Sequence, residues 1–473
     1  MVFSSTSFIF FFLPIVLFFY YLVKNNNFKN YWLLLSSLIF FSWAQPRYLW
    51  IILFNIVINY SCAVVIDRLK KNQKLVLIFA VIANIGVLYY FKYFDFTILS
   101  VNKLLGTDFV LKGIILPIGI SFFTFQGLSY VIDVYRKDIS VQKNIAKVAL
   151  YITMFPQLVA GPIVRYKDIE HELTTSRNIS VDDFSYGIQR FIIGLGKKVL
   201  IANPMAEFVD SIWSGGVTGL SSTTAWVTSI AYTLQIYFDF SGYSDMAIGL
   251  GRMFGFKFNE NFNLPYVSKS ISEFWRRWHI SLCSWLKDYV YIPLGGNRTG
   301  NVYIHLSIVF LLTGIWHGAA WHFILWGIWN GLFVVVERFV KSKQLNPLSK
   351  FNSFVSHFIK NIYALCIINF GWVLFRAPNI HEAKSFILSM LGVNGSEDYS
   401  LLSLYMDRGT LTMLVLGIIF SSSLPSTIGV YLKEKFSLSS CYLSKSILLL
   451  FIFFISIIQV ISGSYNPFIY FQF

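Results

Sequence analysis

One histidine of the sequence has a setting that suits acid–base chemistry. His317 lies in the stretch LLTGIWHGAAWHF, between two apolar runs and beside the small residues Gly314, Gly318 and Ala319. Small side chains let a backbone or a substrate approach closely, and an imidazole can accept a proton near neutral pH. A buried imidazole that only bonds to a neighbouring carbonyl would leave the same local pattern. The sequence around His317 therefore favours a general base but leaves a structural role open.

Of the other six histidines, His279 and His322 are also of interest, and four are weaker candidates. Three lie in or beside polar stretches and are expected to face water: His171, His357 and His381. His305 begins an apolar run, where a boundary position explains it. His322 follows His317 by five residues, which gives an offset of about 140° on a helix, so the two do not share a face as the pair in H-E-x-x-H does. With Glu337 as the nearest carboxylate downstream, we expect no metal site.

The segment from 268 to 298, SKSISEFWRRWHISLCSWLKDYVYIPLGGNR, has a second candidate histidine, His279. Ser270 and Glu273 have the spacing of a capping box at a helix start. On a helical wheel, Arg276 and Arg277 lie outside an apolar arc about 120° wide, and His279 lies just beyond its edge. The arc contains Ile271, Phe274, Trp275, Trp278, Leu282, Trp285 and Leu286. The pattern predicts one amphipathic helix, either a plain membrane anchor or the wall of a wet cavity.

A third polar group occurs in LQIYFDFSGYSDMAIGLGRMFG, where Asp239, Tyr243 and Asp245 interrupt an apolar run. Ionisable side chains at membrane depth are costly and are usually functional. The two acids could orient a base, pair with Arg276 or Arg277, or bind a cation. A purely structural salt bridge would explain them equally well.

The composition indicates which elements hold these residues. The chain of 473 residues is 56% hydrophobic and only 13% charged, against roughly 25% charged residues in soluble domains. The net charge is +15, but Lys and Arg stand in short loops between apolar runs, as the positive-inside bias predicts. The sequence therefore indicates a multi-pass membrane protein and argues against nucleic-acid binding.

We expect an all-α chain that forms one integral membrane domain, residues 1–473, with about 11–13 transmembrane or re-entrant helices. Basic loops after the first, third and fifth apolar runs predict a cytoplasmic position for those loops and an N-terminus outside. The predicted membrane segments are residues 5–23, 31–44, 48–66, 75–92, 113–133, 144–160, 184–203, 222–250, 302–317, 320–340, 355–375, 410–430 and 445–463.

Taken together, these stretches resemble the membrane-bound O-acyltransferase family, and within it the bacterial alginate O-acetylase type. The resemblance rests on LPIGISFFTFQGLSYVIDVYR, FPQLVAGPIVRY, QIYFDFSGYSDMAIGLGRMFGF, NFNLPYVSKSISEFWRRWHISLCSWLKDYVYIPLGGNR and LLTGIWHGAAWHFILWG, with the opening MVFSS and the closing NPFIYFQF. It covers essentially the whole chain.

The resemblance implies a multi-helix fold around a central tunnel and assigns roles to residues of this chain. His317 matches the near-invariant family histidine and would be the catalytic base. His279 matches a second signature position and, as a further catalytic residue, would polarise the thioester carbonyl or orient the acceptor. If their helix faces the cytoplasm, Arg276 and Arg277 would lie near the phosphates of coenzyme A. Five further residues would bind substrate or shape the tunnel: Trp275, Trp278, Trp316, Asp239 and Tyr243.

One position departs from the family pattern. Related sequences often carry a further histidine in a WGxxHG-like stretch, and this chain has WGIWNG, with Asn330 in its place. An amide can hydrogen-bond but cannot act as a base near pH 7. We keep Asn330 as a candidate substrate-binding residue and expect the missing histidine to be dispensable.

The resemblance also implies a donor, an acceptor and partners. The donor is expected to be an acyl thioester, acetyl-CoA from the cytoplasm, with no tightly bound cofactor. The acceptor is expected to be a hydroxyl of an extracytoplasmic polysaccharide, or a periplasmic SGNH-type acetyltransferase that works with the machinery of exopolysaccharide or alginate biosynthesis. The expected location is the bacterial inner membrane.

Three other functions remain open at this stage. Kinked apolar segments and intramembrane acids would suit a transporter or flippase for a polysaccharide precursor, although no inverted repeat is visible. A D-alanyl transferase for teichoic acid would use the same family features. A membrane scaffold would need no histidine chemistry. The sequence does not identify the acceptor, for which alginate, peptidoglycan and cellulose are all compatible.

Overall fold

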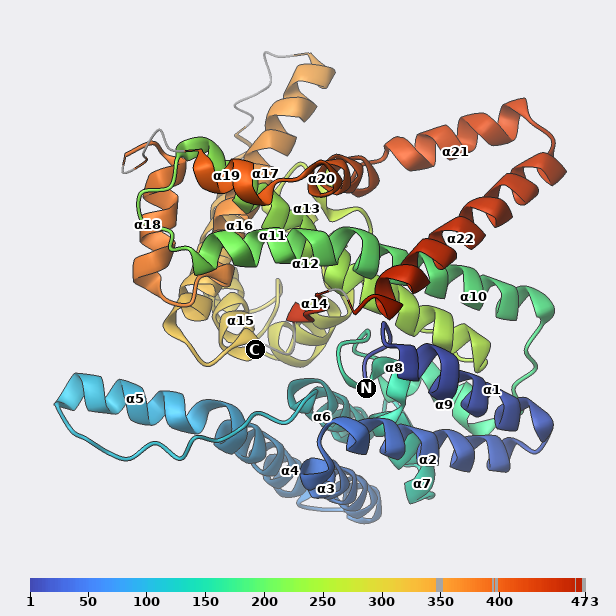
Figure 1. Cartoon of the computed structure of the whole chain (residues 1–473). Coiled ribbons are helices and arrows are strands. Elements are labelled where there is room, and N and C mark those ends of the chain that lie inside the picture. Colours follow the sequence, from blue (N-terminus) through green and yellow to red (C-terminus); the bar gives the residue numbers. More distant parts are fainter. Residues whose placement is uncertain (346–351, 394, 396–398, 464, 470–473) are drawn as a thin grey trace. The chain divides into compact units, whose positions relative to one another are not determined.

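The computed structural model describes residues 1–345, 352–393, 395, 399–463 and 465–469, and the regular secondary structure of this part is all helical. Figure 1 shows its helices in sequence colours. Two compact units are present, residues 1–191 with 243–259 and residues 192–242 with 260–473. The all-α prediction is confirmed over the described residues. The prediction of one membrane domain and the predicted tunnel stay predictions. Residues 470–473 of the closing segment lie outside the described residues.

The first unit contains the N-terminal helices. Its elements are η1 (Phe8–Phe12), α1 (Leu13–Leu22), α2 (Asn26–Ala44), η2 (Pro46–Tyr48), α3 (Leu49–Arg68), α4 (Gln73–Leu88), η3 (Tyr89–Tyr93), α5 (Phe94–Leu105), α6 (Ile120–Arg136), α7 (Ile145–Thr153), α8 (Phe155–Leu158), α9 (Tyr166–Thr174), and parts of α10 (Val181–Gly196) and α12 (Ser222–Met253). In Figure 1, α4 continues through η3 into α5 as one long helix.

The second unit contains the remaining parts of α10 and α12 and the C-terminal half of the chain. Its other elements are η4 (Lys197–Ala202), α11 (Asn203–Ser214), η5 (Pro265–Val267), α13 (Ile271–Arg277), α14 (Ile280–Leu286), η6 (Lys287–Tyr291), α15 (Val302–His317), α16 (Trp321–Ser342), α17 (Ser353–Arg376), α18 (Ile380–Met390), α19 (Ser400–Tyr405), α20 (Arg408–Ser421), α21 (Leu424–Lys435) and α22 (Leu438–Ile461).

Each of the thirteen predicted membrane segments overlaps at least one helix, and 302–317 coincides with α15. Among the described residues, five helices are long and apolar enough to cross a membrane: Pro46–Arg68, Gln73–Leu105, Trp321–Ser342, Ser353–Arg376 and Ser439–Ile461. The pair α20 and α21, bent by 70°, would make a sixth if it forms one span. The predicted number of 11–13 segments includes shorter helices, and it stays a prediction.

Buried amides hold the first unit together between α3, α4 and α6. Asn55 and Asn59 of α3 each donate through Nδ2 to Oδ1 of Asn84 on α4, at 2.7 and 3.1 Å, and Asn84 donates back to Asn59 Oδ1 at 3.0 Å. A Cβ at Gly127 of α6 would lie 2.3 Å from Asn59 Nδ2, so glycine lets α6 approach α3. Interhelical amide bonds of this kind associate helices where lipid offers no hydrogen-bond partner.

Small residues bring α15 and α16 together in the second unit. A Cβ at Gly314 would lie 2.5 Å from the carbonyl oxygen of Phe323, and one at Gly327 would lie 2.5 Å from that of Phe310. The two helices therefore touch along their backbones, as the small residues around His317 predict. Extended backbone at Gly318 and Ala320 separates the end of α15 from the start of α16.

The segment 271–291 differs from the single amphipathic helix predicted for it. The apolar arc is confirmed, since all seven of its side chains are buried. Ser270 caps α13 by accepting from Glu273 N at 3.0 Å, but the Glu273 carboxylate accepts from Lys269 N instead of closing the box on Ser270. The predicted continuity is wrong, because α13 ends at Arg277 and α14 begins at Ile280.

Candidate functional site

His279 stands at the break between α13 and α14, in the left-handed region with φ 44° and ψ 51°. A residue other than glycine is strained there. The neighbouring chain compensates, because Asn263 N donates to Arg277 O and Ile280 N donates to Asn261 O, at 2.9 and 3.0 Å. These bonds from the loop before α13 stabilise the interruption between α13 and α14. The side chain of His279 is fully buried in the protein.

The start of α13 is fixed by a carboxylate from α16. Glu337 accepts through Oε1 from Ile271 N at 2.6 Å and through Oε2 from Ser272 N at 2.9 Å. These N–H groups have no partner within the helix, and a negative charge is favourable at a helix N-terminus. Glu337 therefore has a structural role here, and it ties the segment that carries His279 to the helix that follows His317.

His317 is the last residue of α15, and its side chain is 5% exposed. Its ring contacts three aromatic rings edge-on, with centroid distances of 4.9 Å to Trp316, 4.8 Å to Trp326 and 5.2 Å to Phe375. α15, α16 and α17 each supply one of these neighbours. The imidazole is thus positioned by three helices at the place where α15 stops.

Aromatic rings connect the two histidines. The centroid of Trp316 lies 6.0 Å from that of His279 and 4.9 Å from that of His317. From His317 the contacts continue to Trp326, on to Trp372 at 6.0 Å, and from Trp372 to Trp278 at 4.8 Å. Because Trp278 precedes His279 in the chain, these rings form a closed circuit, which we call the imidazole–tryptophan ring. It consists of Trp278, His279, Trp316, His317, Trp326 and Trp372.

The structure therefore brings most of the predicted aromatic and histidine candidates together. Trp275 joins them, because its ring lies 5.6 Å from that of Trp326. Asn330 is buried one turn after Trp326 and donates through Nδ2 to the Trp326 carbonyl at 2.9 Å. These side chains come from α13, from the break between α13 and α14, and from α15 and α16, all in the second unit.

The two arginines are placed differently. Arg276 is exposed at the end of α13. Arg277 forms an ion pair with Glu273, at 2.9 Å from Nη2 to Oε1, and donates to Asn263 O at 3.1 Å. Arg276 is accessible to an anion, whereas Arg277 helps to hold the loop before α13. No contact described here tests their predicted role toward coenzyme A phosphates.

Asp239 and Asp245 of α12 form ion pairs with cations other than Arg276 and Arg277, the partners considered from the sequence. Asp239 lies 2.7 Å from Lys198 Nζ and accepts from Ile469 N at 2.8 Å, so it fixes the C-terminal segment inside the second unit. Asp245 pairs with Arg190 at 2.7 Å in the first unit. Both fit the structural salt bridge among the alternatives. The neighbour of Asp239, Phe240, lies edge-on to His279 with centroids 4.7 Å apart.

Tyr243 belongs to the first unit, where its ring stacks on Phe3 with centroids 4.6 Å apart. The side chain is buried. Its predicted role in substrate binding stays a prediction.

Asn261 fixes the protonation pattern of His279. Its Oδ1 accepts from Ser281 N at 3.2 Å and from Ser281 Oγ at 2.9 Å. Because a backbone N–H can only donate, this amide atom must be the oxygen. His279 Nδ1 lies 3.2 Å from the same oxygen, so Nδ1 carries the hydrogen and the lone pair of the neutral ring is on Nε2.

Burial keeps this imidazole neutral. Loss of solvation lowers the pKa of His279 from its ordinary value of 6.5 to about 3, since a charged ring is unfavourable away from water. At neutral pH the side chain is therefore a hydrogen-bond acceptor at Nε2 and is difficult to protonate.

The sequence analysis missed Asn261, Trp326 and Trp372. Asn261 lies in the polar loop NENFNLPY, and nothing in that stretch shows which side chain it will meet. Trp326 and Trp372 stand on apolar helices, where an aromatic residue predicts only core packing. The one available signal was the concentration of tryptophans around the two motifs that contain His279 and His317.

The five remaining histidines lie outside the imidazole–tryptophan ring. His171, His357 and His381 are exposed. His305 is buried near the start of α15, with Nδ1 3.0 Å from Gly296 O. His322 is buried in the first turn of α16 beside Phe323, with ring centroids 4.2 Å apart. Neither His305 nor His322 belongs to the imidazole–tryptophan ring.

Comparison with known proteins shows the family of this chain. The family model described as "MBOAT, membrane-bound O-acyltransferase family" matches residues 1–376, which include both histidines. The chain belongs to this family. It is therefore a membrane-bound acyltransferase, and the predicted family resemblance is confirmed.

The relatives extend the likeness over most of the chain. It is 38% identical over 468 residues to the "Probable alginate O-acetylase AlgI" of Pseudomonas putida, covering 93% of this chain and 94% of the relative. It is 43% identical over 365 residues to the protein of the same name in Pseudomonas aeruginosa, covering 74% and 67%. It is 38% identical over 394 residues to the "Peptidoglycan O-acetyltransferase" of Helicobacter pylori, covering 77% and 74%.

Proposed function

We propose that this acyltransferase moves an acetyl group from acetyl-CoA on the cytoplasmic side of the bacterial inner membrane to a hydroxyl outside it, with His317 as the base. The observation that carries the proposal is the imidazole–tryptophan ring, which holds two buried histidines around one tryptophan. The relatives named as O-acetylase or O-acetyltransferase support acetyl as the group moved.

The two histidines have different tasks in this proposal. His279 presents a lone pair at Nε2, so it accepts a hydrogen bond from a second hydroxyl of the acceptor and orients the acceptor, which leaves the single proton of the attacking hydroxyl to His317. His279 does not polarise the thioester carbonyl, since that task needs a donor. Because burial keeps His279 neutral, proton transfer is assigned to His317.

The proposed reaction is an acyl transfer from the thioester sulfur to the acceptor oxygen. The acceptor oxygen attacks the thioester carbonyl carbon while His317 removes the hydroxyl proton. The carbon–sulfur bond breaks, and His317 returns the proton to the departing thiolate. The products are the O-acetyl ester and free coenzyme A. Trp275, Trp278 and Trp316 exclude water, which would otherwise hydrolyse the thioester.

The acceptor is a polysaccharide hydroxyl, or the hydroxyl of a periplasmic SGNH-type acetyltransferase that completes the transfer. The donor is a substrate, and no tightly bound cofactor is required. Arg276, exposed beside the site, is the candidate contact for a coenzyme A phosphate.

Release of coenzyme A tests the proposal. The purified protein in proteoliposomes is supplied with acetyl-CoA and an acceptor glycan, and the free thiol and the acetyl ester are both measured. We expect equal amounts of the two products. Transport of glycan without thiol release would instead indicate a flippase. Transfer from a D-alanyl thioester on a carrier protein, but not from acetyl-CoA, would indicate a D-alanyl transferase.

A further inference from the structure

The last two helices of the second unit form an open pair. α21 and α22 are joined by the short link Phe436–Ser437 and diverge from it (Figure 1). Only 11% of the most apolar part of Ser439–Ile461 is buried inside the protein. Large side chains along both helices are exposed, including Ile428 and Tyr431 on α21 and Phe451 on α22. In a membrane protein such surfaces contact lipid chains.

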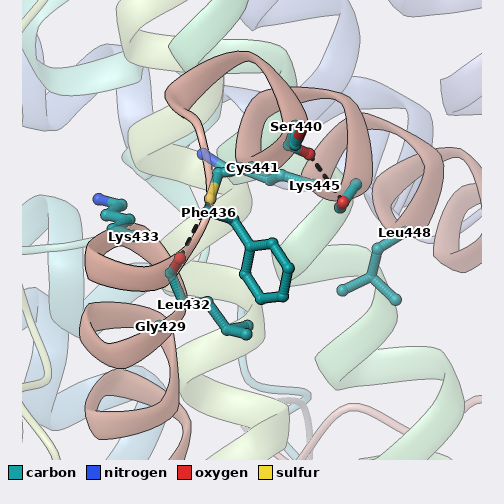
Figure 2. A pocket seen from close by; sticks show the side chains of 9 residues that line it. Gly429, Leu432, Lys433, Phe436, Ser440, Cys441, Lys445 and Leu448 are labelled. Carbon is teal, nitrogen blue, oxygen red and sulfur yellow. Dashed lines mark hydrogen bonds between the residues drawn. The ribbon is translucent and has the colours of Figure 1, made fainter.

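A cavity of about 440 Å³ lies between these helices near the link. Figure 2 shows Leu432, Phe436 and Leu448 as its apolar wall. A Cβ at Gly429 would meet no described heavy atom within 4 Å, so glycine leaves this part of the groove open. The remaining space suits a flexible apolar chain.

The polar end of the groove is basic. Lys433 of α21 and Lys445 of α22 both line it, one from each helix (Figure 2). No carboxylate belongs to the nine described residues that line the cavity. Basic pockets between membrane helices are suited to the phosphate of an anionic lipid, because a lysine can keep its ammonium at the headgroup level while its stem lies along apolar surface.

We propose that the groove between α21 and α22 binds an anionic phospholipid of the bilayer. Its phosphate contacts Lys433 and Lys445, and an acyl chain lies along Leu432, Phe436 and Leu448. The two helices have few contacts with each other beyond the link, so the bound lipid also fixes the angle between them. The site is separate from the two histidines and does not depend on the proposed function.

The test uses the full-length protein in phosphatidylcholine vesicles, with phosphatidylglycerol added as the probe. Binding is followed by the shift of the thermal unfolding midpoint as the concentration of phosphatidylglycerol rises. The double variant K433Q/K445Q should bind phosphatidylglycerol at least about tenfold more weakly, because two surface lysines each contribute to anionic lipid attraction. Additional phosphatidylcholine should give no shift.

Two further variants separate charge from shape. K435Q removes one positive charge from α21, as K433Q does, but outside the groove lining. It should keep the wild-type response. G429L fills the apolar slot while both lysines remain, and it should lose the response. Each variant is compared with its own midpoint in phosphatidylcholine alone, so a general loss of stability is recognised.

Two results would overturn the proposal. One is an equal response to phosphatidylglycerol in wild type, K433Q/K445Q and G429L. The other is an equal shift with glycerophosphoglycerol, which has the phosphodiester charge of the headgroup without chains, since this would indicate a site for a soluble anion.

Discussion

Each unit has a buried polar cluster, and the two clusters differ in the chemistry that their side chains can perform. The amides of Asn55, Asn59 and Asn84 bond to one another between α3 and α4. The imidazoles of His279 and His317 lie among aromatic rings instead. A side-chain amide cannot act as an acid or a base near neutral pH, whereas an imidazole can. We infer that the first cluster holds helices together and the second performs the chemistry.

The largest predicted effect in this comparison is on the rate of transfer. His279→Asn removes the imidazole but keeps a residue that tolerates the left-handed backbone. We expect kcat for acetyl transfer to fall by about 10²-fold or more, with little change in the thermal unfolding midpoint. A variant that stays fully active would show that His279 is only structural.

A smaller effect is expected where Asn261 is changed. Asn261→Ala should lower kcat by about tenfold, because the proton on Nδ1 is no longer held in place. Asn261→Asp keeps an acceptor oxygen and should restore most of the rate. Its carboxylate should also raise the pKa of His279 and move the acid limb of the pH–rate profile to higher pH. If both variants lose activity through unfolding alone, the positioning role is wrong.

Stability should depend on pH through His279. Its pKa is about 3 in the folded protein and 6.5 as the ordinary value. Between these values the unfolded chain binds a proton that the folded protein does not, so stability falls as pH drops through this window. The slope should reach about 1.4 kcal/mol per pH unit. Unfolding of wild type and His279→Asn in detergent between these pH values measures it, and identical slopes would contradict it.

The smallest effect concerns the amide cluster. Asn84→Ala should lower the free energy of unfolding by about 1 kcal/mol, since interhelical hydrogen bonds in membranes are individually weak. The rate of acetyl transfer per folded molecule should not change. Unfolding curves and kcat, measured on the same preparation, check both statements, and a selective loss of kcat would place the cluster in the catalytic machinery.

The segment around His279 shows which structural features the sequence predicts and which it does not. All seven side chains of the apolar arc on the helical wheel are buried, because burial follows the periodicity of the chain. His279 and Ser281 are also buried, although they lie outside the arc. The break at His279 was not predictable, since a strained φ of 44° depends on bonds from Asn261 and Asn263, which a helical wheel does not contain.

The same distinction applies to the rest of the site. The ends of α15 agree with the prediction because Asn301 caps its start and Gly318 follows its end, both visible in the sequence. The pairing of Asp239 with Lys198 was not visible, since it joins α12 to η4 through the tertiary fold. The choice of Trp326 and Trp372 as neighbours of the histidines also depends on how α16 and α17 pack.

The most direct test of the central claim is the rate of coenzyme A release from acetyl-CoA for His317→Ala and His322→Ala, at equal amounts of folded protein in proteoliposomes. Both changes remove a buried histidine from neighbouring positions of the same region, but only His317 belongs to the imidazole–tryptophan ring. We predict that His317→Ala loses transfer almost completely and that His322→Ala retains it. Equal rates for the two variants would contradict the account.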